Sequence, residues 1–234
     1  MEETPPPQKA KYIIELPVRI WHWSIVICIA TLILTGYYIG YPWHSIDGHP
    51  TYLFLMGYMR IVHFSAGFIL AIGIFLRLIY AFFGNNYSKQ IFVIPIWQKS
   101  WWHGLIGDFR WYLFIDKTPH VHYDHNPLAQ VGMFGCIFLI FFMTFTGMGM
   151  FIMSSDNPWL VHTFHWVLDV AYWVGGNGID LHNWHRLGML FIIAFIIIHL
   201  YMVIREEIMG NTTLVSAMFN GFKLVRLIKQ PKKN

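Results

Sequence analysis

The stretch that decides the fold is Tyr172–Arg205, which reads YWVGGNGIDLHNWHRLGMLFIIAFIIIHLYMVIR. Its long hydrophobic run has His185 at the start and His199 near the end. If the run is helical, a rotation of about 1400°, close to four full turns, separates the two histidines, so they share one face. They also lie about 21 Å apart along the axis. Because the hydrocarbon core of a bilayer is about 30 Å thick, the stretch predicts a membrane-spanning helix with one imidazole toward each side.

The composition indicates an integral membrane protein. Of 234 residues, 56% are hydrophobic, 18% are aromatic and only 12% are charged, which is too apolar for an ordinary soluble domain. The hydrophobic runs that are long enough to cross a membrane lie at residues 18–41, 59–83, 129–153 and 186–205. Each run is close to the roughly 20 residues that a helical span needs. We therefore expect an all-α fold, an integral membrane four-helix bundle that forms one membrane domain over residues 1–234, and a first span that is retained rather than cleaved.

Lysine and arginine predict the orientation in the membrane. They are concentrated in the N-terminal tail, in the loop between the second and third spans and in the C-terminal tail. Residues 41–59 and 154–184 contain neither. Under the positive-inside rule, both termini and the central loop are cytoplasmic, and the other two loops are periplasmic. The formal net charge of +4 then follows from membrane topology, and we expect no nucleic-acid partner.

Three further segments are expected at the membrane surface as additional interfacial amphipathic helices. Residues 84–128 mix tryptophan with Lys and Arg, which predicts a partly helical segment on the cytoplasmic surface. Residues 157–173 are amphipathic and aromatic, which favours the periplasmic interface. Residues 211–230 are basic and predict a surface helix on anionic lipid. The proline-rich residues 1–11 predict a flexible tail.

Four histidines lie within the spans and predict two haem sites. His22 begins the first span and His199 nearly ends the fourth, so both are expected near the cytoplasmic face. His63 and His185 begin the second and fourth spans, so both are expected near the periplasmic face. Ionisable groups inside a span are costly and are usually functional, and facing imidazoles are typical of haem ligation. We expect bis-histidine pairs His22 with His199 and His63 with His185; the alternative is satisfied core histidines without a cofactor.

The expected haems are of b type. Cys28 and Cys136 lie in the middle of the first and third spans, and the chain has neither a C-x-x-C-H motif nor four cysteines for a cluster. Arg60 and Arg186 lie beside the histidines near the periplasmic face, where they could pair with haem propionates. Snorkelling to the lipid headgroups would explain them equally well. Gly36 is expected to leave room for a porphyrin edge.

The remaining histidines are weaker candidates and are read mainly as loop or interface residues: His44, His49, His103, His120, His122, His125, His162, His165 and His182. The pattern H-x-H-x-x-H at residues 120–125 is compatible with a metal, but no second cluster supports it. His182 lies one turn before the fourth-span histidine and is the alternative ligand there. The third span has no histidine but four glycines, and we expect it to serve in packing.

Three motifs resemble a known family. PVRIWHW at residues 17–23, MGYMRIVHFSAG at residues 56–67, and YWVGGNGIDLHNWHRLGM through His199 resemble the cytochrome b subunit of membrane-bound nickel–iron uptake hydrogenases. The resemblance runs from Tyr12 to Gly221, and its first motif is shared with formate dehydrogenase gamma subunits. It implies that the four span histidines are the haem ligands. It also implies a bacterial inner-membrane complex in which periplasmic large (nickel–iron) and small (iron–sulfur) hydrogenase subunits oxidise H2 and reduce this chain.

We therefore expect a di-haem electron-transfer subunit that delivers electrons to a quinone near the cytoplasmic face. No catalytic residue is expected, because the chain lacks the cysteines of a hydrogen-activating centre. The partner is expected to dock on residues 154–184 and 41–59, with contacts from Asp169, Tyr172 and Trp173. The ionisable residues nearest the expected quinone are Arg205, Glu206 and Glu207. The alternative is a haem b membrane anchor of another complex such as formate dehydrogenase; no inverted repeat supports a transporter.

Overall fold

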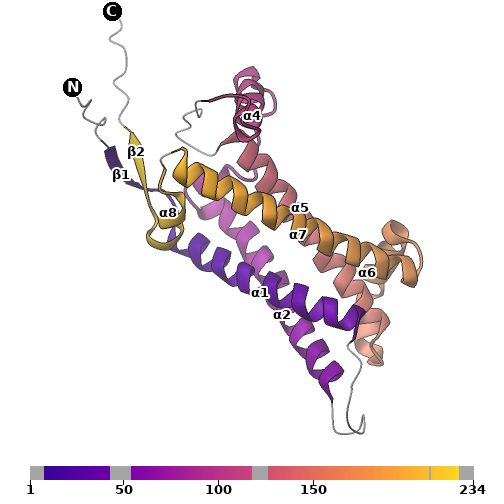
Figure 1. The fold of residues 1–234 in the computed structure, drawn as a ribbon. Coiled ribbons are helices and arrows are strands. Elements are labelled where there is room, and N and C mark those ends of the chain that lie inside the picture. The colour runs from indigo at the N-terminus through magenta and orange to yellow at the C-terminus, as the bar shows by residue number, and fades with distance from the viewer. Residues whose placement is uncertain (1–7, 43–53, 118–125, 211, 227–234) are drawn as a thin grey trace, which may run out of the picture. The chain divides into compact units, whose positions relative to one another are not determined.

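The computed structural model describes residues 8–42, 54–117, 126–210 and 212–226. Four of its helices are long and apolar enough to cross a membrane, which confirms the predicted all-α fold with four spans (Figure 1). They are α1 (Leu16–Gly40), α2 (Leu55–Phe83), α5 (Pro127–Met153) and α7 (Gly178–Ile208). The backbone polar groups of such helices bond within the helix, as the interior of a bilayer requires.

Helix α7 begins at Gly178, earlier than the predicted span at residue 186. The reason is a polar cap that hydropathy does not detect. The Asn177 side chain accepts hydrogen bonds from the backbone N–H groups of Ile179 and Asp180, at 2.9 and 3.1 Å. Asp180 also places a negative charge in the first turn, where the helix dipole favours it. The extension puts His182 and His185 inside the helix.

Four shorter helices lie in the predicted surface segments: α3 (Asn86–Lys89), α4 (Lys99–Tyr112), α6 (Pro158–Gly175) and α8 (Leu214–Asn220). Helix α6 matches the predicted helix at residues 157–173. It begins with Asn157, whose side chain accepts from two backbone N–H groups, followed by Pro158 in the first turn.

The chain ends differ from the prediction, because strands β1 (Gln8–Tyr12) and β2 (Phe222–Arg226) pair antiparallel (Figure 1). The predicted flexible tail at residues 1–11 is therefore wrong for residues 8–11, and the predicted helix at residues 211–230 is wrong for residues 221–226; residues 1–7 and 227–230 lie outside the described residues. Gly221 is the physical reason: its φ of +88° ends α8. Its carbonyl oxygen also accepts from the backbone N–H groups of Ile13 and Ile14, which joins the two ends.

The chain divides into two compact units. Unit 1 comprises Met1–Ile20, Tyr80–Phe134 and Ile196–Asn234, and unit 2 comprises Trp21–Ile79 and Gly135–Phe195. The core of unit 1 includes Ile13, Ile14, Val18 and Ala217, with Tyr80, Tyr87 and Met218 packed against them. The expected single domain over residues 1–234 stays a prediction.

Unit 2 contains parts of all four spans, and each span contacts its neighbours there. On α2, Gly73 lies against Trp21 and Ile25 of α1. The rings of Phe64 and Phe68 on α2 meet Phe151 of α5 edge to face, with centroids 5.1 and 5.4 Å apart. Gly188 of α7 also lies against Met143 of α5, and Arg186 of α7 against Gly40 of α1. The four spans therefore contact one another within unit 2.

Candidate functional site

His63 on α2 is held by a threonine on α1. The imidazole Nδ1 lies 2.9 Å from the hydroxyl oxygen of Thr35, which is buried. That hydroxyl donates its hydrogen to the carbonyl oxygen of Thr31, one turn earlier, at 2.7 Å. Because a hydroxyl has only one hydrogen, Thr35 accepts from the imidazole, and we assign the hydrogen of His63 to Nδ1. Its Nε2 then keeps a lone pair that can bind a metal.

His185 on α7 is held in the same way by α5. Its Nδ1 lies 2.8 Å from the hydroxyl oxygen of Thr146, which is 2% exposed. Thr146 donates to the carbonyl oxygen of Phe142 at 2.9 Å and therefore accepts from the imidazole. His185 is thus also protonated on Nδ1, with the Nε2 lone pair available. We therefore assign the same tautomer to both span histidines, each of which has a buried threonine partner.

A glycine follows each threonine and makes room for the imidazole ring. A Cβ atom on Gly36 would lie 3.1 Å from Cε1 of His63, and one on Gly147 would lie 3.2 Å from Cε1 of His185. The structure puts the His63 ring against Gly36, and the expected room for a porphyrin edge stays a prediction. The third span was expected only to pack, yet it supplies Thr146 and Gly147. The sequence analysis missed both threonines, and the signal was the dipeptide Thr-Gly, which occurs only at residues 35–36 and 146–147.

We expect Gly147→Ala to destabilise the protein while Gly135→Ala, on the same helix, does not. A Cβ on Gly135 has no atom within 4 Å, whereas one on Gly147 presses on His185. Both variants gain about 0.5–1 kcal/mol of helix propensity, but overpacking costs about 1–3 kcal/mol. Unfolding in detergent should show Gly147→Ala as the less stable variant. Equal stabilities would contradict the tight contact.

Unit 2 brings His63 and His185 together at one end. Their side chains lie near enough to interact electrostatically. Arg186, next in sequence, is exposed; it donates to the Tyr41 hydroxyl at 2.9 Å, and its guanidinium carbon lies 4.6 Å from the centroid of that ring. Arg60 is also exposed, on α2. A positively charged, aromatic edge therefore adjoins the two histidines.

His22 and His199 belong to different units, and their pairing stays a prediction. Each is partly exposed on its helix. Near His22 lies an arginine that the sequence analysis did not single out. Arg77 is 2% exposed, and its guanidinium carbon lies 5.6 Å from the centroid of Trp21, the residue before His22. Unit 2 therefore carries a buried positive charge against Trp21, which precedes His22 in sequence.

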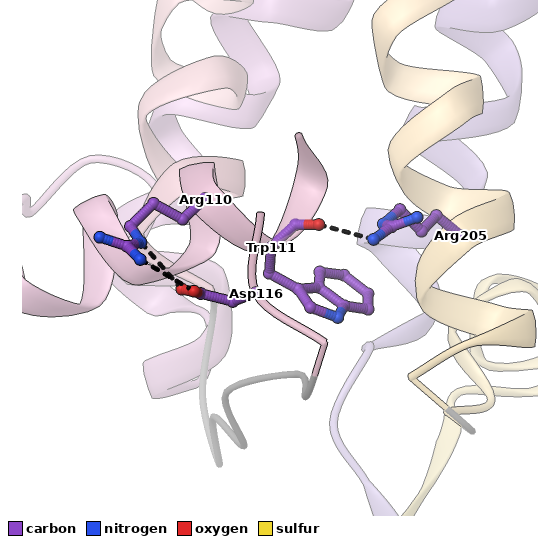
Figure 2. Close-up of polar contacts among 4 residues, drawn as sticks. All are labelled: Arg110, Trp111, Asp116 and Arg205. Carbon is purple, nitrogen blue, oxygen red and sulfur yellow. Dashed lines mark hydrogen bonds and ion pairs between the residues drawn. The ribbon is translucent and has the colours of Figure 1, made fainter. Parts of the chain in front are cut away.

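Arg205, one of the residues suggested for a quinone, is buried in unit 1 and binds the end of α4. Its Nη2 donates to the carbonyl oxygen of Trp111 at 2.6 Å, and its guanidinium carbon lies 4.5 Å from the Trp111 ring centroid (Figure 2). Phe114 covers the same guanidinium at 3.7 Å. At the end of α4, Arg110 donates two hydrogen bonds of 3.1 Å to the carboxylate of Asp116, which closes the turn after the helix (Figure 2). Arg205 thus anchors α4 to α7.

Glu206 accepts a hydrogen bond from the hydroxyl of Tyr112, at 3.2 Å. Burial, followed by the charge of Glu206, raises the pKa of Tyr112, so the phenol stays protonated. The hydroxyl of Tyr201 donates to the Tyr112 carbonyl at 2.6 Å. Glu207 instead accepts from the backbone N–H of Val215. A phenol and a carboxylate therefore form a half-buried proton-binding pair beyond His199.

Of the other histidines, His165 and His182 bond elsewhere, His103 and His162 are exposed on α4 and α6, and five lie outside the described residues. Nδ1 of His182, the alternative ligand, is 2.7 Å from the Gly178 carbonyl oxygen, and the side chain is exposed. His165 pairs with Asp169 at 2.8 Å on the exposed surface of α6. His44, His49, His120, His122 and His125 lie outside the described residues. Within the part of the chain that the structure describes, no three His, Cys, Asp or Glu residues group into a metal site.

The residues around His63 and His185 fit a b-type haem. Two neutral imidazoles are suitable axial ligands for its iron. Metal-binding histidines almost always donate their other ring N–H to a fixed partner, as both do here through Nδ1. The ring of Phe64, whose centroid lies 6.3 Å from that of His63, and Phe151 against it would supply apolar surface for a macrocycle. When bound, the haem supplies one-electron oxidation and reduction.

Comparison with known proteins finds matches across all four spans. Residues 13–221 match the family described as prokaryotic cytochrome b561. A "Probable Ni/Fe-hydrogenase 1 B-type cytochrome subunit" of Escherichia coli (strain K12) is 47% identical over 212 residues, which cover 91% of this chain and 90% of that protein. A "Probable Ni/Fe-hydrogenase B-type cytochrome subunit" is 40% identical in Cupriavidus necator, over 92% of this chain and 87% of that protein. The protein of that name in Azotobacter vinelandii is 38% identical, over 94% of this chain and 90% of that protein.

Proposed function

We propose that this chain, which belongs to the prokaryotic cytochrome b561 family and to the Ni/Fe-hydrogenase B-type cytochrome subunits, holds two haems and carries electrons from a periplasmic hydrogenase to a quinone. The membership itself makes the chain a multi-pass membrane protein that binds haem b and transfers electrons. The observation that carries the proposal is the matched pair of histidines in unit 2, each fixed by a buried threonine.

In this proposal, His63 and His185 hold one haem near the periplasmic face. Their Nε2 atoms would hold the haem iron, and the Nδ1–H bonds to Thr35 and Thr146 would keep both imidazoles in that tautomer. The exposed guanidinium groups of Arg60 and Arg186 stand at the same end and serve the propionates. These two are the arginines nearest to the two histidines in sequence.

His22 and His199 hold the second haem in this proposal, near the cytoplasmic face. The support for this pair is the depth of the two histidines in the membrane. His199 follows His185 on α7 by about 21 Å of helix rise, and His22 lies toward the opposite end of α1 from Thr35. Two sites at different depths allow electrons to cross the low-dielectric layer. A single site would leave them on the side where they entered.

The charge distribution supports an orientation in which both termini lie in the cytoplasm. We place the chain in the inner membrane of a bacterium. Every Lys and Arg except Arg60, Arg77 and Arg186 belongs to unit 1. The loops without positive charge belong to unit 2, together with His63 and His185. The hydrogenase-facing side is therefore the side with α6, and the quinone is reduced on the side with α4. There, the Glu206 carboxylate, which accepts a hydrogen bond from Tyr112, is suited to take up protons and pass them to the quinol.

The relatives' names point to a hydrogenase rather than a formate dehydrogenase as the redox partner. We propose that its small and large subunits dock on residues 154–184 and 41–59. Helix α6 presents tryptophans that are 59–86% exposed: Trp159, Trp166 and Trp173. Tryptophan is enriched among the residues that carry most of the energy of interfaces. Of the three contacts suggested from the sequence, Trp173 is the most exposed at 86%, whereas the Tyr172 hydroxyl turns to Met153 of α5.

We expect H2 to reduce the haem of this chain only when the hydrogenase subunits are present, and Trp173→Ala to weaken that complex. Loss of a central tryptophan typically costs about 2 kcal/mol or more, roughly 30-fold in affinity. Trp97→Ala is the matched control, because Trp97 is 72% exposed but lies in unit 1. Absorbance spectra under H2, with graded amounts of hydrogenase, measure the effect. Reduction of the isolated chain by H2 would overturn the proposal, and equal affinities for the two variants would move the docking surface elsewhere.

A further inference from the structure

We propose that Thr35 and Thr146 are paired positioning residues that lower the reduction potential of one shared haem. This inference rests on the proposed ligation by His63 and His185 and deepens it. Each threonine accepts a hydrogen bond from Nδ1–H of one histidine. Such a bond makes the imidazole a more basic ligand. A more basic ligand stabilises the ferric form and lowers the potential.

The two threonine–histidine pairs have the same arrangement, which indicates a common function. Thr35 follows Leu16, the first residue of α1, by 19 positions, and Thr146 follows Pro127, the first residue of α5, by 19 positions. In both cases a glycine comes next and lies against Cε1 of the histidine. The histidine in both cases belongs to the next long span and lies near its start. The α1–α2 pair therefore repeats as the α5–α7 pair.

Burial makes these hydrogen bonds stronger than ordinary surface contacts. Thr35 is 6% exposed and Thr146 is 2% exposed, so water does not compete for their hydroxyl groups. Both hydroxyls also donate to the carbonyl one turn earlier, which fixes the direction of each oxygen. The accepting lone pair then points at one imidazole. A rotation of the ring would break the bond, so the threonines also fix the ring plane.

The test replaces each threonine by the isosteric valine, in the complex with its hydrogenase, and titrates both haems. We expect Thr35→Val and Thr146→Val each to raise the potential of the same haem. Loss of one hydrogen bond should change its ratio of reduced to oxidised form by about three- to tenfold at fixed potential; tenfold corresponds to about 59 mV for one electron. The affected haem is the one that disappears in His185→Ala. Haem content and optical spectra are recorded alongside the titration.

Three controls make the result decisive. Thr31→Val removes a hydroxyl that bonds only one turn back, to Ile27, at 2.9 Å, and should change neither potential. The serine variants of Thr35 and Thr146 keep the hydroxyl and should restore the native potential. If the valine variants keep both haems and shift neither potential, the threonine role is overturned while the two-haem proposal stands. If they shift two different haems, each threonine acts on its own site, and both the shared haem and the pairing of His63 with His185 are wrong.

Discussion

Replacing His63 or His185 by alanine should remove one b-type haem and leave the other. Both histidines belong to one unit, both carry the Nδ1 hydrogen toward a threonine, and both offer Nε2. A six-coordinate haem that loses an axial ligand from a bundle without covalent attachment is poorly held. We expect the haem-to-protein ratio to fall from two to about one in each variant, because one of two binding sites is lost. Pyridine haemochrome analysis and low-temperature spectra measure it.

The double variant separates a shared site from two independent sites. If His63 and His185 serve one haem, removing both should cost no more haem than removing either. His182→Ala is the matched control, because this exposed histidine lies one turn before His185 and is bound to the Gly178 carbonyl. It should retain both haems. Retention of both haems in His63→Ala, or loss of both in the double variant, would contradict the assigned pairing.

The four spans could be predicted from sequence because the signal is local. A run of about 20 apolar residues has few other uses than to cross a membrane. The first residues of the helices were harder to predict from the sequence. Helix α7 begins at Gly178 because of Asn177 and Asp180, and polar caps of this kind lower the mean hydropathy that identifies a span. The prediction therefore found the centre of each span better than its ends.

The sheet between β1 and β2 could not be predicted from either strand alone. Lys11 pairs with Lys223 and Tyr12 with Phe222, from opposite ends of the chain. Residues 222–226 have too few positions to distinguish a short strand from the end of an amphipathic helix. What decides the structure is the left-handed Gly221 and its carbonyl oxygen, which binds the N–H groups of Ile13 and Ile14. Such a contact depends on tertiary structure.

Only the histidines of the candidate site could be predicted from the sequence. Histidines in a span stand out because they are costly there, so the spacing of His185 and His199 carried the argument. Thr35 and Thr146 did not stand out, because a threonine in a membrane helix usually bonds its own backbone. Both do so here, and each also holds an imidazole. Comparing the first and third spans for a shared dipeptide would have found them.

The second large effect concerns the membrane potential. If electrons enter near His63 and His185 and leave near His22 and His199, they move inward across most of the membrane. Against an interior-negative potential this costs about 2.3 kcal/mol per electron for each 100 mV. Turnover should therefore build a potential and should slow as that potential grows. In this proposal, quinol formation takes its protons from the cytoplasmic side, on which we place Glu206 of unit 1.

The most direct test of the two-haem account uses proteoliposomes that carry the complex with its hydrogenase subunits outside. Oxidation of H2 by a membrane quinone should make the lumen electrically negative and alkaline, and an ionophore that collapses the potential should accelerate quinol formation. His199→Ala is the control, and it should abolish the potential together with quinol formation. The account predicts an inside-negative potential that appears with the first turnovers. Quinol formation at the native rate without a potential or lumen alkalinisation would place quinone reduction on the hydrogenase side and would contradict it.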